Sequence, residues 1–156
     1  MSDTSLTIDN ILAPDLTLCK VPASSKKRVL EFIAEQIRQH NDSLGESQIF
    51  NNLIARERLG STGIGQGIAI PHCRLEGLEH VIGVLITLEE AVEFDAIDNQ
   101  PVDLVFALVV PKEATSEHLE LLSQLAEKFN ESTFCDSLRQ CEDAQTLYQR
   151  MTAENG

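Results

Sequence analysis

Apolar residues recur along this chain in segments of two kinds, which alternate between its two ends. Short apolar segments of strand length predict β-strands at 16–21, 68–70, 81–88 and 102–110. Longer segments, in which apolar residues recur three and four positions apart, predict helices at 25–40, 47–59, 116–129, 131–140 and 143–151. The last two strands are nearly continuous apolar runs, typical of a sheet covered on both faces. The pattern therefore predicts an α/β fold, a three-layer α/β/α sandwich with helices flanking the sheet on both faces.

A glycine-rich segment at 60–72 follows the second predicted helix and contains the second predicted strand. It joins four glycines and two hydroxyl side chains to an apolar run that leads to His72. Glycine lets backbone N–H groups approach an anion closely and tolerates the positive φ angles of anion-binding nests. We therefore expect a phosphate seat beside His72, with donors from Ser61, Thr62, Gly63 and Gly65.

The spacing of these glycines separates the segment from common nucleotide-binding motifs. It matches neither the dinucleotide fingerprint nor the phosphate loop of nucleotide hydrolases, which ends in Gly-Lys-Ser/Thr. A glycine-rich connection followed by a strand and a turn is also a common structural device, so the glycines alone leave that interpretation open. Pro71 has a fixed φ angle and no backbone donor, so we expect it to end the strand ladder and to leave His72 at the strand tip.

Charge is distributed unevenly around this segment. The chain carries 25 acidic and 12 basic residues and a formal net charge of −13, yet residues 51–75 hold three arginines against one acid. Arginine binds phosphate through a rigid fork of donors. We expect Arg56 at the edge of an apolar helix stripe, Arg74 in a turn and Arg58 on a solvated helix face. The overall acidity argues against nucleic acid as a partner, because its phosphates would meet a repulsive field.

Two further residues allow both a structural and a functional interpretation. Glu57 falls near the centre of the apolar stripe of its helix, where a carboxylate needs an ion-pair partner or loop N–H groups. His118 begins the apolar stripe of the helix at 116–129, which by itself favours a buried core histidine. It also lies in the first turn of that helix, where free N–H groups favour a nearby anion.

Several of these segments together resemble the nitrogen-regulatory enzyme IIA family of the bacterial phosphotransferase system, which is related to the mannitol and fructose IIA domains. The resemblance covers about residues 6–151 and is carried by Arg56-Glu57, residues 60–72, residues 94–104 and His118-Leu119. It implies a single phosphotransferase-system IIA type 2 domain over residues 1–156, with a mixed central sheet. It also implies that His72 accepts a phosphoryl group from the phosphohistidine of a small HPr-like carrier, with Arg56 and His118 as catalytic groups beside it.

The resemblance leaves two functions open for this phosphotransferase component. A regulatory protein would bind target proteins, such as potassium transport or sensor kinase components, according to the phosphate on His72. A sugar-specific carrier of mannitol or fructose type would instead pass the phosphate to a IIB partner. A metal-dependent hydrolase, outside the family, would need acidic ligands beside His72 and His118, and no HxxE, HxH or HExxH spacing supplies them. We expect no metal and no cofactor.

The composition also bears on location. Residues 1–5 have neither the basic region nor the apolar core of a signal peptide, and no apolar run reaches membrane-spanning length. The four cysteines show no CxxC spacing, so we expect neither a disulfide framework nor a zinc knuckle. A cytoplasmic protein with reduced thiols and no membrane insertion is the expectation.

Overall fold

The computed structural model describes residues 8–153 apart from 43 and 114–116, and describes the backbone alone at residues 9, 117 and 118. The strands are β1 (Thr17–Val21), β2 (Gly63–Gly65), β3 (Ile68–Ala69), β4 (His72–Leu75), β5 (Ile82–Val92) and β6 (Val102–Pro111). The helices are α1 (Ile8–Ile11), η1 (Pro14–Leu16), α2 (Lys26–His40), α3 (Glu46–Leu59), α4 (Glu117–Phe129), α5 (Ser132–Arg139) and α6 (Ala144–Thr152). None of the described helices is long and apolar enough to cross a membrane.

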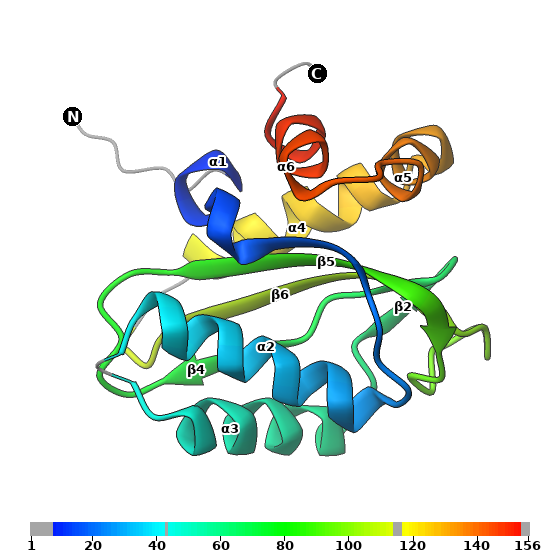
Figure 1. The fold of residues 1–156 in the computed structure, drawn as a ribbon. Helices are drawn as coiled ribbons and strands as arrows, with labels where there is room; N and C mark the ends of the chain where they lie inside the picture. The colour runs from blue at the N-terminus through cyan, green and yellow to red at the C-terminus, as the bar shows by residue number, and fades with distance from the viewer. Residues whose placement is uncertain (1–7, 43, 114–116, 154–156) are drawn as a thin grey trace.

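The helices form two layers with the sheet between them (Figure 1). Helices α2 and α3 lie on one side, and α1, α4, α5 and α6 lie on the other. The apolar stripes predicted from sequence face the sheet: Ile33 and Ile37 of α2 and Leu147 of α6 are fully buried. The predicted three-layer α/β/α sandwich is therefore confirmed.

The sheet is mixed, as the resemblance implied. Its order is β1-β5-β6-β3-β2, and β4 pairs with β6 beyond β3. Strand β6 is antiparallel to β5 and parallel to both β3 and β4. The run from Leu104 to Val109 has almost no exposed surface, because both of its faces are covered by helices. Strand β6 is consequently the centre on which the rest of the sheet is aligned.

The predicted helix boundaries differ slightly from the observed ones for a physical reason. Ser25 and Asp143, which the pattern included in helices, are N-cap residues with extended backbones. The Ser25 hydroxyl accepts a hydrogen bond from the N–H of Arg28 at 3.2 Å. A cap residue satisfies the first free N–H groups of the helix without being helical itself. Residue 116, the predicted start of another helix, lies outside the described residues.

The largest departure from expectation concerns the strands near the glycine-rich segment. Pro71 interrupts the pairing with β6 but does not end it, because its carbonyl still accepts from the N–H of Leu108 at 2.8 Å. Pairing resumes at once, with His72 opposite Leu108 in the parallel register. The expectation that the ladder ends at Pro71 is therefore wrong: His72 begins a strand. Strand β2, which no apolar run predicted, pairs antiparallel with β3.

Close packing between β5 and β6 predicts a sensitive glycine. A Cβ atom on Gly83 would lie 2.9 Å from Cε1 of Phe106 and 3.2 Å from Cδ1 of Ile11. Phe106 is fully buried and has no room to move. We expect Gly83→Ala to lower the free energy of unfolding by about 1–3 kcal/mol, measured by urea denaturation.

The matched control makes the same substitution in a protein where the residue that faces Gly83 is smaller. In a Phe106→Leu background the new methyl group has space, so Gly83→Ala should cost clearly less than it does in the wild type. An equal cost in both backgrounds would show that contact with the Phe106 ring is not the cause.

Candidate functional site

His72 takes its position from β6 and from its own neighbours in the chain. It is the first residue of β4, and its side chain is half-buried. The imidazole Nδ1 lies 2.8 Å from the carbonyl oxygen of Ile70, two residues earlier. This bond turns the other ring nitrogen, Nε2, away from the chain that precedes it.

Arg56 contacts that second nitrogen from the last turn of α3. Its Nε donates to Nε2 of His72 at 3.3 Å, and its Nη1 donates to the carbonyl of Gly60 at 2.9 Å. A carbonyl only accepts and a guanidinium only donates, so these partners define the neutral imidazole tautomer. The proton is on Nδ1, and Nε2 keeps the lone pair. The site therefore places the lone pair of Nε2 against the guanidinium of Arg56.

A pocket of about 530 Å³ opens beside these two residues, between α3, β4, β6 and α4. Arg74 lines it too, while Arg58 is exposed elsewhere on α3, as expected. The expected turn at Arg74 is not found, because this residue lies in β4 and its Nη1 donates to the carbonyl of Lys112 at 3.0 Å. Apolar side chains form much of the remaining wall: Leu59, Leu108, Val110 and Leu122.

Glu57 has the partners that its place on the helix requires. Its Oε1 lies 2.8 Å from Nζ of Lys26 and accepts from the N–H of Thr62 at 3.2 Å. The Thr62 hydroxyl donates to the other carboxylate oxygen. The structural interpretation of Glu57 is thus confirmed. Sequence reasoning missed Lys26, because nothing local joins two residues on different helices.

The other predicted phosphate donors are held by the segment that follows β5. The Ser61 hydroxyl donates to the carbonyl of Phe94 at 2.5 Å and accepts from the N–H of Gly63 at 3.0 Å. Gly63 packs so tightly that an added Cβ would lie 2.8 Å from Cβ of Ala96. A phosphate role for Ser61, Thr62, Gly63 and Gly65 stays a prediction.

A short turn after Gly65 is held by a carboxylate that sequence reasoning did not single out. Gly65 has φ +100° and Gln66 has φ +60°, so the chain reverses here with left-handed backbone. Asp98 accepts from the N–H groups of Gln66 at 2.9 Å and of Gln100 at 3.1 Å. These bonds stabilise the ionised form of the side chain over the protonated form, and so hold the pKa of Asp98 below its ordinary value.

His118 lies on the helix that closes the pocket. It is the second residue of α4, one turn before Leu122, which lines the pocket. Its side chain lies outside the described residues. The assignment of His118 as a group beside His72 therefore stays a prediction.

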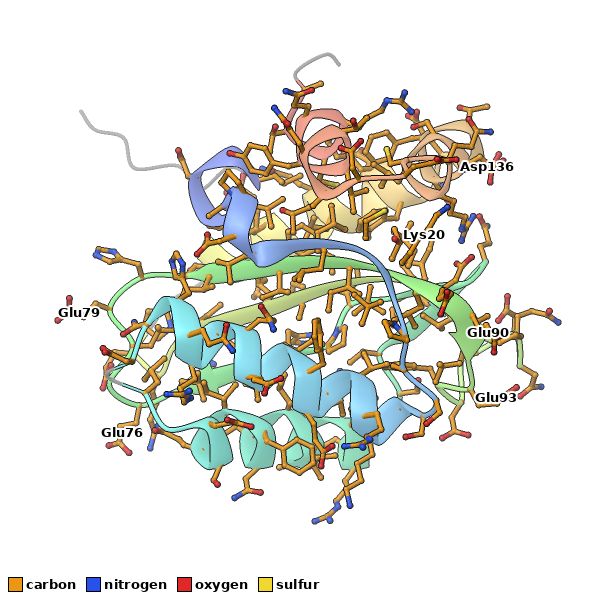
Figure 2. All side chains as sticks on the ribbon, viewed as in Figure 1. Lys20, Glu76, Glu79, Glu90, Glu93 and Asp136 are labelled. Carbon is orange, nitrogen blue, oxygen red and sulfur yellow. The ribbon has the colours of Figure 1, made fainter. Side chains whose placement is uncertain are left out.

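Several acidic residues are exposed at the two ends of the molecule. Figure 2 labels Glu76 and Glu79 at one end of the molecule and Glu90 and Glu93 at the other, and all four are exposed. A larger hollow of about 850 Å³ between α2, α3 and the end of β5 has several glutamates in its lining, so it would repel a phosphate. Within the part of the chain that is described, no group of three or more His, Cys, Asp or Glu side chains could hold a metal ion.

This arrangement matches a known family. Residues 10–154 fit the family described as "Phosphoenolpyruvate-dependent sugar phosphotransferase system, EIIA 2". The chain belongs to this family. A protein named nitrogen regulatory protein from Pseudomonas aeruginosa is 49% identical to it over 142 residues, 91% of this chain and 92% of the relative. A protein of the same name from Escherichia coli is 44% identical over 156 residues, 99% of this chain and 95% of the relative.

Solved structures agree with this assignment. The nitrogen regulatory protein IIA-Ntr from Neisseria meningitidis is similar with a TM-score of 0.85 and 41% identity, covering 93% of this chain and 99% of that one. The mannitol IIA protein of Escherichia coli has a TM-score of 0.69 at 18% identity, covering 96% and 100%, and shares the fold. The resemblance to the nitrogen-regulatory branch is confirmed.

Cys73 follows His72 and also lines the pocket, so its reactivity tests how closed this EIIA 2 site is. Burial raises the pKa of its thiol to about 12 from 9.0. At pH 8 the thiolate should be about a thousandfold scarcer than for an ordinary cysteine. We expect iodoacetamide to leave Cys73 unmodified in the folded protein and to modify it in urea, as measured by peptide mass spectrometry. Alkylation of folded protein at the rate of a free thiol would contradict this.

Proposed function

We propose that this EIIA 2 protein accepts a phosphoryl group on Nε2 of His72 from an HPr-like carrier, and that the phosphate determines which target proteins it binds. The contact between Nε of Arg56 and Nε2 of His72 carries the proposal. It places a fixed positive charge at the atom where a phosphoryl group would arrive. Electrostatic groups arranged before the reaction are the main means of stabilising phosphoryl transfer.

The proposed step exchanges one N–P bond for another. The Nε–H of Arg56 first leaves the lone pair of Nε2 and turns to a phosphoryl oxygen. That lone pair attacks the phosphorus of the carrier's phosphohistidine, and the bond from phosphorus to the carrier's imidazole breaks. The electron pair of that bond remains on the carrier's nitrogen. Positive charge that develops on the His72 ring is stabilised by the bond from Nδ1–H to the carbonyl of Ile70. Neutral imidazole is a nucleophile without a separate base.

Arginine supplies the positive field that this step needs. The guanidinium of Arg56 has five N–H donors and uses two of them in the bonds described, so others can meet phosphoryl oxygens. Arg74 lines the same pocket. We propose His118 as a further donor. Ser61, Thr62 and the N–H groups of Gly63 and Gly65 would be lesser donors, since the two hydroxyls and the Gly63 N–H must first leave their present partners.

The surface around His72 supports a protein as the phosphoryl donor. The large apolar side chains that are exposed among the described residues include Leu59 at 83% and Ile97 at 82%. Leu59 lines the pocket beside His72, and the N–H of Ile97 donates to the carbonyl of Gly63 at 3.4 Å. Exposed apolar side chains near a reactive group are typical of a protein docking surface. A single IIA domain acting in the cytoplasm, where thiols stay reduced, agrees with its free cysteines.

Radiolabelling tests the nucleophile directly. Incubation with phosphoenolpyruvate, enzyme I and an HPr-like carrier should label the wild type and leave His72→Ala unlabelled, because Nε2 is the only atom proposed to accept phosphate. The label should be lost in acid, as a phosphoramidate is. The control is His80→Ala, which removes an exposed histidine from the surface and should be labelled normally. Strong label on folded His72→Ala would reject the assignment.

Partner binding separates regulation from sugar transport. Phosphate adds about −1.5 to −2 charges and would engage the Arg56 guanidinium, so a target bound by one form should meet a different surface on the other. We expect at least about a tenfold difference in Kd between the two forms, near 1.4 kcal/mol. Isothermal titration with a target recovered from cell extract measures it. Equal affinities together with rapid transfer of phosphate to a IIB protein would favour the sugar-carrier alternative.

A further inference from the structure

We infer that the buried ion pair between Lys26 and Glu57 is a positioning device for phosphoryl transfer, which fixes the turn after α3 so that Arg56 is held against His72. The reaction that it serves rests on the proposed function. The geometric part, that the ion pair orients Arg56, does not. Neither Lys26 nor Glu57 contacts the phosphate in this account, and both act through the turn.

Burial makes this ion pair unusual among the charges of the described chain. The Glu57 side chain is 4% exposed and that of Lys26 is 21% exposed, with 2.8 Å between Oε1 and Nζ. Two groups of Thr62, the backbone N–H and the hydroxyl, complete the set of donors around the carboxylate. Apolar residues of similar volume often stabilise a fold as well as a buried ion pair does. Stability alone therefore does not explain why charges are found here.

The position of Lys26 adds to this argument. It is the first residue of α2, where the positive end of the helix dipole disfavours a cation. Its Nζ also lies 3.5 Å from the carbonyl of Phe94 and 5.3 Å from the centre of the Phe94 ring. The Ser61 hydroxyl donates to that same carbonyl. Lys26 thus joins α2, the end of α3 and the segment after β5 at one point, against the preference of its own helix.

A continuous series of contacts leads from this point to the nucleophile. Glu57 holds Thr62, and the carbonyl of Glu57 accepts from the N–H of Gly60 at 3.1 Å. The residues between Glu57 and Thr62 are therefore held at both ends. The carbonyl of Gly60 accepts from Nη1 of Arg56, whose Nε donates to His72. If Thr62 is released, the carbonyl that orients the guanidinium loses its fixed position.

The test is a double-mutant cycle on transfer kinetics. Glu57→Gln keeps the size of the side chain and removes its charge, so kcat for transfer from the phosphorylated carrier should fall at least tenfold. KM for the carrier should change less than twofold, since the exposed apolar surface is untouched. Arg56→Ala/Glu57→Gln should be no slower than Arg56→Ala alone, because Glu57 acts through Arg56. Losses that multiply would overturn the inference.

Two further variants separate positioning from stability. Leu147→Ala opens a cavity under α6, on the opposite side of the sheet from α3, and should lower the melting temperature while leaving transfer at the wild-type rate. All rates are measured at a temperature where each variant is folded. Thr62→Val removes the hydroxyl that reaches Glu57. Because Thr62 is also a proposed phosphate donor, this variant is judged by the NMR signal of Arg56 and not by its transfer rate, and it carries the test if Glu57→Gln does not fold.

A spectroscopic measurement distinguishes the failure of this inference from the failure of the proposed function. The Nε–H of Arg56 should give a slowly exchanging NMR signal in the wild type, because it is bonded to His72. The signal should broaden or vanish in Glu57→Gln, or in Thr62→Val. If the wild type accepts no phosphate, the proposed function fails and this signal still judges the positioning. An intact signal in the variant, whether transfer is fast or slow, would overturn the positioning and leave the proposed function standing.

Discussion

Strand β6 is paired on both edges and buried on both faces, and the site takes its geometry from that constraint. A strand in this position can neither slip in register nor bend without exposing apolar surface or breaking two ladders. Leu108, near its far end, is opposite His72, so this imidazole is attached to a strand that is held at both edges and on both faces. Pro71 has no N–H, but the carbonyl that it keeps is the group that β6 requires.

Electrostatics divides the molecule into a repulsive exterior and a small attractive region. With a net charge of −13, the surface favours solubility and opposes anions in general. Around His72 the local balance is reversed, because Arg56 and Arg74 line the pocket and the one nearby acid of the α3 end, Glu57, is neutralised by Lys26. An anion carried on a protein would therefore meet a favourable field beside His72.

The glycines at 60–72 have a role in packing and a proposed role in phosphate binding. Gly63 lacks a side chain where Ala96 approaches it, and Gly65 has a left-handed backbone next to Asp98. Packing against the segment at 94–104 therefore explains these glycines without any ligand. It also explains why that segment accompanies the glycines in the family resemblance, since it forms the wall that holds them. The same glycines carry backbone N–H groups that the proposed phosphate site would use.

Sequence alone determined the three layers of this protein, the burial of its two longest strands on both faces and the need of Glu57 for a partner. Through its resemblance, the sequence also determined the family. These features depend on the periodicity of apolar residues and on short motifs, which are local properties. The tertiary structure decided the rest. It set the return of β-pairing after Pro71, the choice of Lys26 as the partner of Glu57 and the tautomer of His72. It also gave the hydroxyls of Ser61 and Thr62 partners within the protein. The contacts of Arg56 with His72, of Lys26 with Glu57 and of Ser61 with Phe94 join residues that are far apart in the chain, and only folding brings their atoms within hydrogen-bonding distance.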